Sequence, residues 1–341
     1  MAFSPNSGNK CGGGKQAAVV SGSDDLRSSL MLLKTDQTKC YNESGQDVTC
    51  VGSGQDGETN RIQSNPETRF EVRDRVVADR ATGLCWSQNA SPATWPMSWV
   101  EAFEYVAQLN QSGYLKIDDW RLPSRRELFS LISHQHINQA LPSGHPFTHV
   151  FSGYYWTASE CQRLADQAWY IHLGGGRIYR GMKKNFYLVW PVSGFQADDE
   201  QMSDRFVIQN STARDRLTKL VWLRTPDAMQ HPVKWKKALE AIVALNAQNA
   251  GGYADWRLPN IRELESLVDL NRHSPALAPG HPFDHIAEGY WSATTSVYEK
   301  RYAWVFYPRD GAVGVGYKPL PEFYAWAVRC DAHGATSAGQ F

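Results

Sequence analysis

The sequence lacks several features that would assign it to a common functional class. Its charges balance, with 35 lysine and arginine residues against 35 aspartate and glutamate residues, so no overall field favours nucleic acid or an anionic membrane surface. No apolar run approaches the roughly 20 residues that a membrane-spanning helix needs. We therefore expect no nucleic-acid partner and no bilayer-spanning segment, and any binding of a polyanion must depend on local groups of charge.

The six cysteines do not form a pattern that is typical of a metal site. None lies in a C-x-x-C pair or beside histidine at zinc-finger spacing. Cys40 and Cys50 flank a short polar loop that a disulfide closes readily, so we predict this bond and an oxidising compartment outside the cytoplasm. Cys85 and Cys161 fit equally well as small buried hydrophobic residues. The pairing of four cysteines stays open: Cys11, Cys85, Cys161 and Cys330.

Signatures of metal-dependent catalysis or calcium binding are also missing. The histidine pairs of HPFTH at 145–149 and HPFDH at 281–285 would share one helical face, but Pro146 and Pro282 argue against a helix there. No glutamate stands in either segment as a general base. The loops carry no E-P-N or Q-P-D triplet of a calcium-dependent lectin. We expect no metal, no cofactor and no catalytic residue.

What the sequence does contain is a long internal repeat. The phrase DDWRLPSRREL recurs as ADWRLPNIREL, so that Asp119 and Asp255 are 136 residues apart, and the offset slips to 135 between Trp156 and Trp291. This period is too long for a solenoid and predicts two similar domains of ordinary size. The expected organisation is a flexible leader at 1–30, a first domain at 31–196, a second domain at 197–333 and a flexible tail at 334–341.

Each repeat predicts the same order of elements. Alternating residues at 69–86 indicate two short strands, and the stripe that begins at Trp99 indicates a helix. Ser98 with Glu101, and Ser124 with Glu127, form capping boxes at the starts of two helices. Aromatic strands with glycine turns follow. We therefore predict an α+β fold in which each domain packs two helices on a small antiparallel sheet.

The repeated WRLP phrase is interpreted as scaffold. Its leucine is biased to extended backbone by the proline that follows, and a capped helix comes next. Asp119 and Arg121, like Asp255 and Arg257, are expected to tie this lead-in to neighbouring backbone. Catalytic use of these charged residues stays the alternative, although no nucleophile or base lies nearby in the sequence.

The ordered set TGLCW, DWRLPSRREL, HPF, YYWTAS and AWAVRC resembles a bacterial domain of unknown function, typified by the C-terminal domain of the Legionella collagen-like adhesin. The phrase WRLP and the last strand also look like the formylglycine-generating-enzyme branch of the C-type-lectin-like folds. The resemblance implies two tandem C-type-lectin-like domains, secretion or surface display, and binding of polyanionic glycans by exposed loops. This chain has no Gly-X-Y collagen tract, and its first repeat ends in VWPVSG rather than AWAVRC.

We favour a binding module, whose ligand is a glycan or a surface protein, over an enzyme. Arginine and lysine pair with sulfate or carboxylate, and aromatic faces stack on sugar rings. The repeated tryptophans are expected in the core. A metal- or thiol-dependent enzyme and a self-assembling structural subunit remain the alternatives. The expected ligand-binding residues are Arg177, Tyr179, Arg180, Lys183 and Lys184 in the first repeat and Tyr298, Arg309, Tyr317 and Lys318 in the second.

Overall fold

The structure, a computed structural model, describes residues 34–60, 69–194, 204–225 and 230–331. The expected leader at 1–30 and tail at 334–341 lie outside the described residues. Segment 34–60 contains β1 (Cys40–Tyr41), β2 (Asp47–Val48) and the short helix α2 (Asp56–Thr59).

The two repeats have the same order of elements, as the internal repeat predicted. The first comprises β3 (Phe70–Arg73), β4 (Val76–Asp79), β5 (Leu84–Ser87), α4 (Trp99–Gln111), η1 (Tyr114–Lys116), α5 (Arg125–Ser130), β6 (Tyr154–Glu160), β7 (Gln167–His172), β8 (Arg177–Met182) and β9 (Val192–Ser193). The second comprises β10 (Phe206–Gln209), β11 (Thr212–Asp215), β12 (Leu220–Leu223), α6 (Trp235–Ala247), η2 (Ala250–Gly252), α7 (Ile261–Glu265), β13 (Tyr290–Thr295), β14 (Tyr302–Tyr307), β15 (Ala312–Tyr317) and β16 (Val328–Cys330).

The predicted capping boxes begin the helices of the first repeat. Ser98 caps α4 and Ser124 caps α5, each in a reciprocal pair with the glutamate three residues later. The carboxylate of Glu127 also accepts two hydrogen bonds of 2.7 Å from the guanidinium of Arg121. Asp119 in turn accepts a hydrogen bond from the hydroxyl of Ser193 on β9. The charged residues of the WRLP phrase therefore hold the lead-in, the helix start and the closing strand together.

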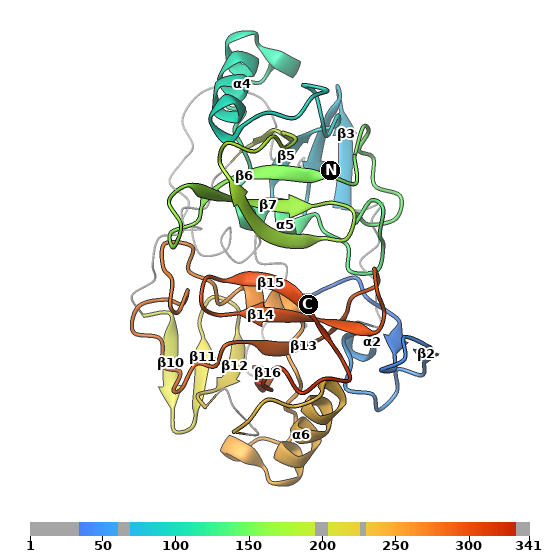
Figure 1. Cartoon of the computed structure of the whole chain (residues 1–341), viewed down its shortest axis with the longest axis vertical. Coiled ribbons are helices and arrows are strands. Elements are labelled where there is room, and N and C mark those ends of the chain that lie inside the picture. The colour runs from blue at the N-terminus through green and yellow to red at the C-terminus, as the bar shows by residue number, and fades with distance from the viewer. Residues whose placement is uncertain (1–33, 61–68, 195–203, 226–229, 332–341) are drawn as a thin grey trace, which may run out of the picture.

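Each repeat builds a four-stranded antiparallel sheet, in the order β3-β4-β5-β9 in the first and β10-β11-β12-β16 in the second. The third sheet has six strands in the order β13-β14-β15-β8-β7-β6 and includes both repeats (Figure 1). We expected a small sheet in each domain, and instead the two three-stranded sheets join edge to edge. The join removes two exposed strand edges, which are sites of unwanted pairing in proteins.

The join has the symmetry of a two-fold interface. Val313 of β15 pairs with Ile178 of β8, and these two residues occupy the same position in the two repeats. Arg126 donates a hydrogen bond to the carbonyl of Val268, and Arg262, its counterpart, donates one to the carbonyl of Ile132. Such reciprocal contacts are typical of isologous interfaces, so the two repeats associate like the subunits of a homodimer.

The two faces of the six-stranded sheet are covered differently. On one face, α5 and α7 pack against the strands, and the largest hydrophobic cluster there includes residues of both repeats. On the other face, α4 covers one end and α6 the other (Figure 1). The repeated tryptophans are buried, as expected: Trp156, Trp169, Trp291 and Trp304.

Segment 34–60 packs against the second repeat, although it falls in the expected first domain (31–196). The side-chain amide of Gln37 accepts from the backbone nitrogen of Thr295 and donates to its carbonyl, at 2.9 and 2.8 Å. The same amide also donates to the carbonyl of His134 in the first repeat. Thr294 donates to the buried carboxylate of Asp56 at the start of α2. Segment 34–60 therefore connects both repeats.

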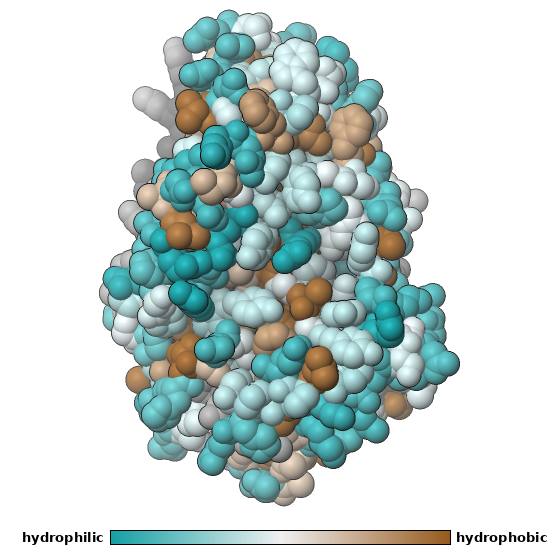
Figure 2. All heavy atoms as spheres, viewed as in Figure 1, coloured by the Kyte–Doolittle hydropathy of each residue, from teal (hydrophilic) through white to brown (hydrophobic). Residues whose placement is uncertain are grey.

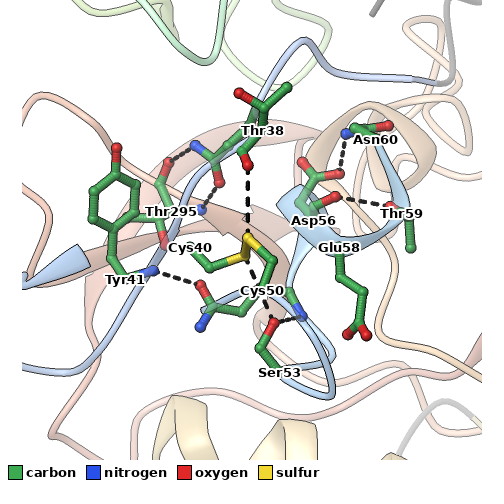
Figure 3. The surroundings of a disulfide bond; sticks show 12 residues. Thr38, Cys40, Tyr41, Cys50, Ser53, Asp56, Glu58, Thr59, Asn60 and Thr295 are labelled. Atoms are coloured by element: carbon green, nitrogen blue, oxygen red, sulfur yellow. Dashed lines mark hydrogen bonds between the residues drawn. A yellow bond between two sulfur atoms is a disulfide. The ribbon is translucent and has the colours of Figure 1, made fainter. Parts of the chain in front are cut away.

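The predicted disulfide between Cys40 and Cys50 is confirmed, with an S–S distance of 2.07 Å (Figure 3). It closes the loop that lies beside Thr295. Cys85 is disulfide-bonded too, which decides between the two alternatives that the sequence left open for it. Cys161 is a buried free thiol and Cys330 an exposed one.

A buried ion pair links the repeats beside the join. The side chain of Arg125 is 0% exposed, lies 3.5 Å from the carboxylate of Glu265 and stacks over Trp169 at 4.4 Å. The equivalent positions in the opposite repeats hold Ile261 and Phe129. The interface is therefore not fully two-fold symmetric. One ion pair lies on one side of the axis, and two apolar residues lie at the symmetric positions.

We predict that Arg125→Ile lowers the free energy of unfolding by about 3–5 kcal/mol, because Glu265 is left buried with less compensation. The double variant Arg125→Ile, Glu265→Leu should be closer to the wild type, since an apolar pair replaces both charges. Chemical denaturation measures both values. Arg73→Ile, which removes an exposed pair with Glu71, is the matched control. Equal losses in the single and double variants would contradict the coupling.

His134 is buried in the same region, with 1% of its surface exposed. Its ring contacts Phe129 and Trp304 edge to face, at 5.6 and 5.8 Å between centroids. Among the described residues, neither ring nitrogen has a hydrogen-bond partner. Burial, and then the neighbouring charge of Arg262, lower the pKa of His134 well below its ordinary value of 6.5.

His134 should make the protein sensitive to acid. Below pH 6.5 the unfolded chain takes up a proton on this histidine and the folded chain does not, so stability falls as the pH falls. His134→Leu, which copies Leu270 of the second repeat, should reduce the loss of melting temperature between pH 7.5 and pH 5. The exposed His136, changed to leucine, serves as the control. An unchanged pH profile in His134→Leu would refute this assignment.

Candidate functional site

The structure does not bring the nine expected ligand-binding residues together. Three of them lie on β8, where the guanidinium groups of Arg177 and Arg180 each lie 4.8 Å from the ring centroid of Tyr179. Lys183 and Lys184 follow β8, and Arg309 lies in the turn before β15. The other three belong to the second repeat: Tyr298, Tyr317 and Lys318.

Arg180 forms an ion pair between the two repeats. Its guanidinium lies 2.7 Å from the carboxylate of Asp310, which Arg163 approaches at 3.4 Å. Asp310 is buried and belongs to the turn between β14 and β15. Arg180 therefore contributes to the join, and the expectation that it lies on an exposed loop is wrong.

Lys318 is also not exposed. Its side chain is 0% exposed, and its ammonium donates 2.9 Å to the hydroxyl of Thr295 and 3.3 Å to the carbonyl of Tyr41. The ammonium lies 4.1 Å from the ring centroid of Trp235. Burial lowers the pKa of Lys318 to about 7. Segment 34–60 covers this lysine, so the expectation that Lys318 lies on an exposed loop is wrong.

Lys183 is the counterpart of Lys318 and has a different environment. Its ammonium lies 4.5 Å from the ring centroid of Trp99, the counterpart of Trp235, and 2.9 Å from the carboxylate of Glu160. Glu160 occupies the position of Thr295. The two repeats thus share a lysine that lies over a tryptophan. In the first repeat this lysine pairs with an exposed carboxylate, and in the second it is covered by segment 34–60.

The remaining expected residues lie at separate points of the surface. Lys184 and Arg309 are exposed. Tyr298 is 67% exposed and lies beside Gly175 of the turn between β7 and β8. Tyr317 packs against Tyr302 at 5.2 Å between ring centroids.

Arg177 and Tyr179 belong instead to a group of side chains on β6, β7, β8 and the segment after β8, on the sheet face that α4 partly covers. The guanidinium of Arg177 lies 4.8 Å from the ring centroid of Tyr179. The rest of the group was not predicted from the sequence. Together the aromatic face, as we call this group, comprises Tyr154, Tyr170, His172, Arg177, Tyr179 and Tyr187.

The rings of the aromatic face are in contact with one another. The centroid of Tyr154 lies 4.7 Å from that of His172, 5.0 Å from that of Tyr170 and 5.1 Å from that of Tyr187. Burial raises the pKa of Tyr170 to about 12. Burial, and then the charge of Arg177, lower the pKa of His172. His172 is therefore neutral at neutral pH, and Arg177 supplies a fixed positive charge.

The HPF segments are loops, as the prolines indicated. His145 stacks on Phe147 at 5.9 Å between centroids, and His281 stacks on Phe283 in the same way at 5.8 Å. His149 and His285 have left-handed backbones. Among the described residues, no three histidine, cysteine or acidic side chains gather as they would around a metal ion.

An open pocket of about 420 Å³ lies in the loop after α7. Its lining includes Arg272, His273 and His281. Burial lowers the pKa of His281, so this histidine is neutral at neutral pH. The pocket offers fewer convergent side chains than the aromatic face does.

Comparison with known proteins gives a family but no named relative. No curated protein matches the chain. Of the helices in the described ranges, none has the length and apolar character needed to cross a bilayer. The model of the Lcl C-terminal domain matches residues 75–193 and again residues 211–329, which together make up more than half of the chain. The chain therefore belongs to the Lcl C-terminal domain family and carries two tandem copies of that domain.

Proposed function

We propose that this protein is a secreted or surface-displayed, adhesin-like protein that binds an anionic glycan. Membership of the Lcl C-terminal domain family supports the proposal, since the family is typified by a surface adhesin. The disulfide between Cys40 and Cys50 supports an oxidising compartment. The C-type-lectin-like character of the domains is part of the same proposal.

The observation that carries the proposal is a local group of cations in a chain with no net charge. Arg177 and Lys184 are exposed on and just after β8, and Lys183 lies between them in sequence. Guanidinium and ammonium groups form charge-assisted hydrogen bonds with sulfate and carboxylate groups. Arg180 adds little to such a surface because Asp310 already neutralises it. Lys183 remains available to a ligand, because its pair with the exposed carboxylate of Glu160 is a weak surface pair. The binding charge is therefore assigned to Arg177, Lys183 and Lys184.

Binding rather than catalysis is part of this proposal. An enzyme that depends on thiols needs an activated or paired cysteine. Cys161 is buried in the first repeat, and Cys330 is exposed on β16 of the second. The contacts of Asp119 and Arg121 described above also give the WRLP phrase a structural role. The places of the two free cysteines and of the WRLP phrase therefore favour a binding protein over an enzyme.

The proposal predicts that the triple variant Arg177→Gln, Lys183→Gln, Lys184→Gln elutes from a heparin column at markedly lower salt than the wild type. Exposed charges are screened beyond about 8 Å at physiological salt, so wild-type retention should itself fall steeply as salt rises. Folding should be spared, because surface substitutions change stability by less than about 0.5 kcal/mol. Melting temperatures verify this.

A variant of equal charge provides the control. Lys234→Gln, Lys236→Gln, Lys237→Gln removes three exposed cations near the start of α6 and should elute with the wild type. If the first triple variant is retained as well as the wild type, the proposal fails at these residues. Loss of retention in the control alone would move the site to the second repeat.

A further inference from the structure

The aromatic face is a property of the first repeat alone. Tyr154 corresponds to Gly289, Arg177 to Ala312 and Tyr179 to Gly314. The two repeats have the same strands in the same register on either side of the join, and a corresponding helix covers each end. The second repeat folds with glycine and alanine at these positions, and Tyr307 and Phe323 pack over the two glycines. The shared strands can therefore form without the two tyrosines and the arginine.

One ring of the aromatic face, that of Tyr187, is needed for packing. Tyr187 lies over Gly181 so closely that a β-carbon there would come within 2.6 Å of its hydroxyl. Its counterpart Phe323 covers Gly316 in the same way. Tyr187 is therefore a packing residue in the first repeat, as Phe323 is in the second. The residues that need another explanation are Tyr154, Arg177 and Tyr179.

Tyr154 is an exposed but immobilised ring. Its side chain is 45% exposed, while the rings of Tyr170, His172 and Tyr187 contact it from within the face. Ligand binding costs little conformational entropy when the contacting side chain is already held in place. Tyrosine also combines a flat apolar ring with a polar hydroxyl, which suits a partner that is itself both apolar and polar.

The exposed aromatic side chains are distributed unevenly between the repeats. Of the described residues, those of the first repeat are Trp95, Phe103, Phe151, Tyr154 and Phe186, and that of the second is Tyr298. Figure 2 views the side on which the sheet lies between α4 and α6, and pale residues of intermediate hydropathy cover much of its middle. A surface of this kind is neither a strongly apolar patch nor a purely charged one.

The spacing of the group fits a small ring with an anionic substituent. Tyr154 lies on β6 and Arg177 on β8, two strand spacings or roughly 10 Å apart. Arg177 is held over the ring of Tyr179, which directs a planar, permanently charged donor toward the same face. A sugar ring can therefore lie on Tyr154 while a sulfate or carboxylate reaches Arg177.

We propose that the aromatic face is a carbohydrate subsite, in which a sugar ring stacks on Tyr154 and an anionic group of the glycan pairs with Arg177 beside Tyr179. The inference rests on the proposed function, because it names the part of the ligand that charge alone does not recognise. The sugar ring is bound by the first repeat only.

The test uses the full chain and two polyanions, a heparin-derived hexasaccharide and inorganic polyphosphate, which has no rings. Tyr154→Ala should weaken hexasaccharide binding about tenfold, equivalent to about 1.4 kcal/mol, and leave polyphosphate binding unchanged, because Arg177 keeps its contact with Tyr179. Tyr298→Ala removes an exposed tyrosine of the second repeat and should change neither. Titration calorimetry measures the affinities, and melting temperatures confirm folding.

The outcomes separate this inference from the proposed function. If the tyrosine variant binds the hexasaccharide as tightly as the wild type while the triple cation variant does not, the subsite is refuted and the charged surface stands. An equal loss for both polyanions refutes stacking too, because polyphosphate has no ring to stack. If Tyr154→Ala fails to fold, Tyr154→Gly, which copies Gly289, gives the same comparison.

Discussion

The antiparallel pairing of β8 with β15 is the constraint on which the rest of the structure depends. Each repeat alone would expose one edge of a three-stranded sheet, and that edge is covered by the matching edge of the other repeat. The pairing places Ile178 against Val313 and brings the turns before these strands close to buried side chains. At Gly176 and Gly311 a β-carbon would come within 2.5 and 2.6 Å of Ile132 and Val268. Both glycines also have positive φ, so larger residues are doubly disfavoured there.

Fusion of the two repeats in one chain allows this interface to differ between its halves. In a true homodimer every residue near the axis would occur twice, so a pair such as Arg125 with Glu265 would form twice or not at all. In this chain Arg125 and Glu265 form one pair, and the symmetric positions are apolar. The same freedom applies to the surface, where segment 34–60 buries Lys318 in one repeat and Glu160 neutralises Lys183 in the other.

Local features could be predicted from the sequence and long-range pairing could not. The capping boxes at Ser98 and Ser124 and the disulfide loop at Cys40 depend on residues close in the chain, so their spacing specifies the contact. The join depends on which sheet edge meets which, and alternation along a strand does not encode that. Arg180 and Lys318 therefore looked like loop cations, although one is bound by Asp310 and the other by segment 34–60.

A different comparison within the sequence does reveal the candidate site. Once the repeats are aligned, positions that are alike, such as Trp156 and Trp291, belong to the shared fold. Positions on the outward face that differ between the repeats can serve a function of one repeat alone. At one of them Tyr154 aligns with Gly289. The aromatic face occurs once among the described residues, so the subsite proposed for it gives each chain one sugar-binding site despite its two domains. On that proposal, multivalent attachment to a glycan surface requires several chains, since effective concentration rises only when linked sites bind together.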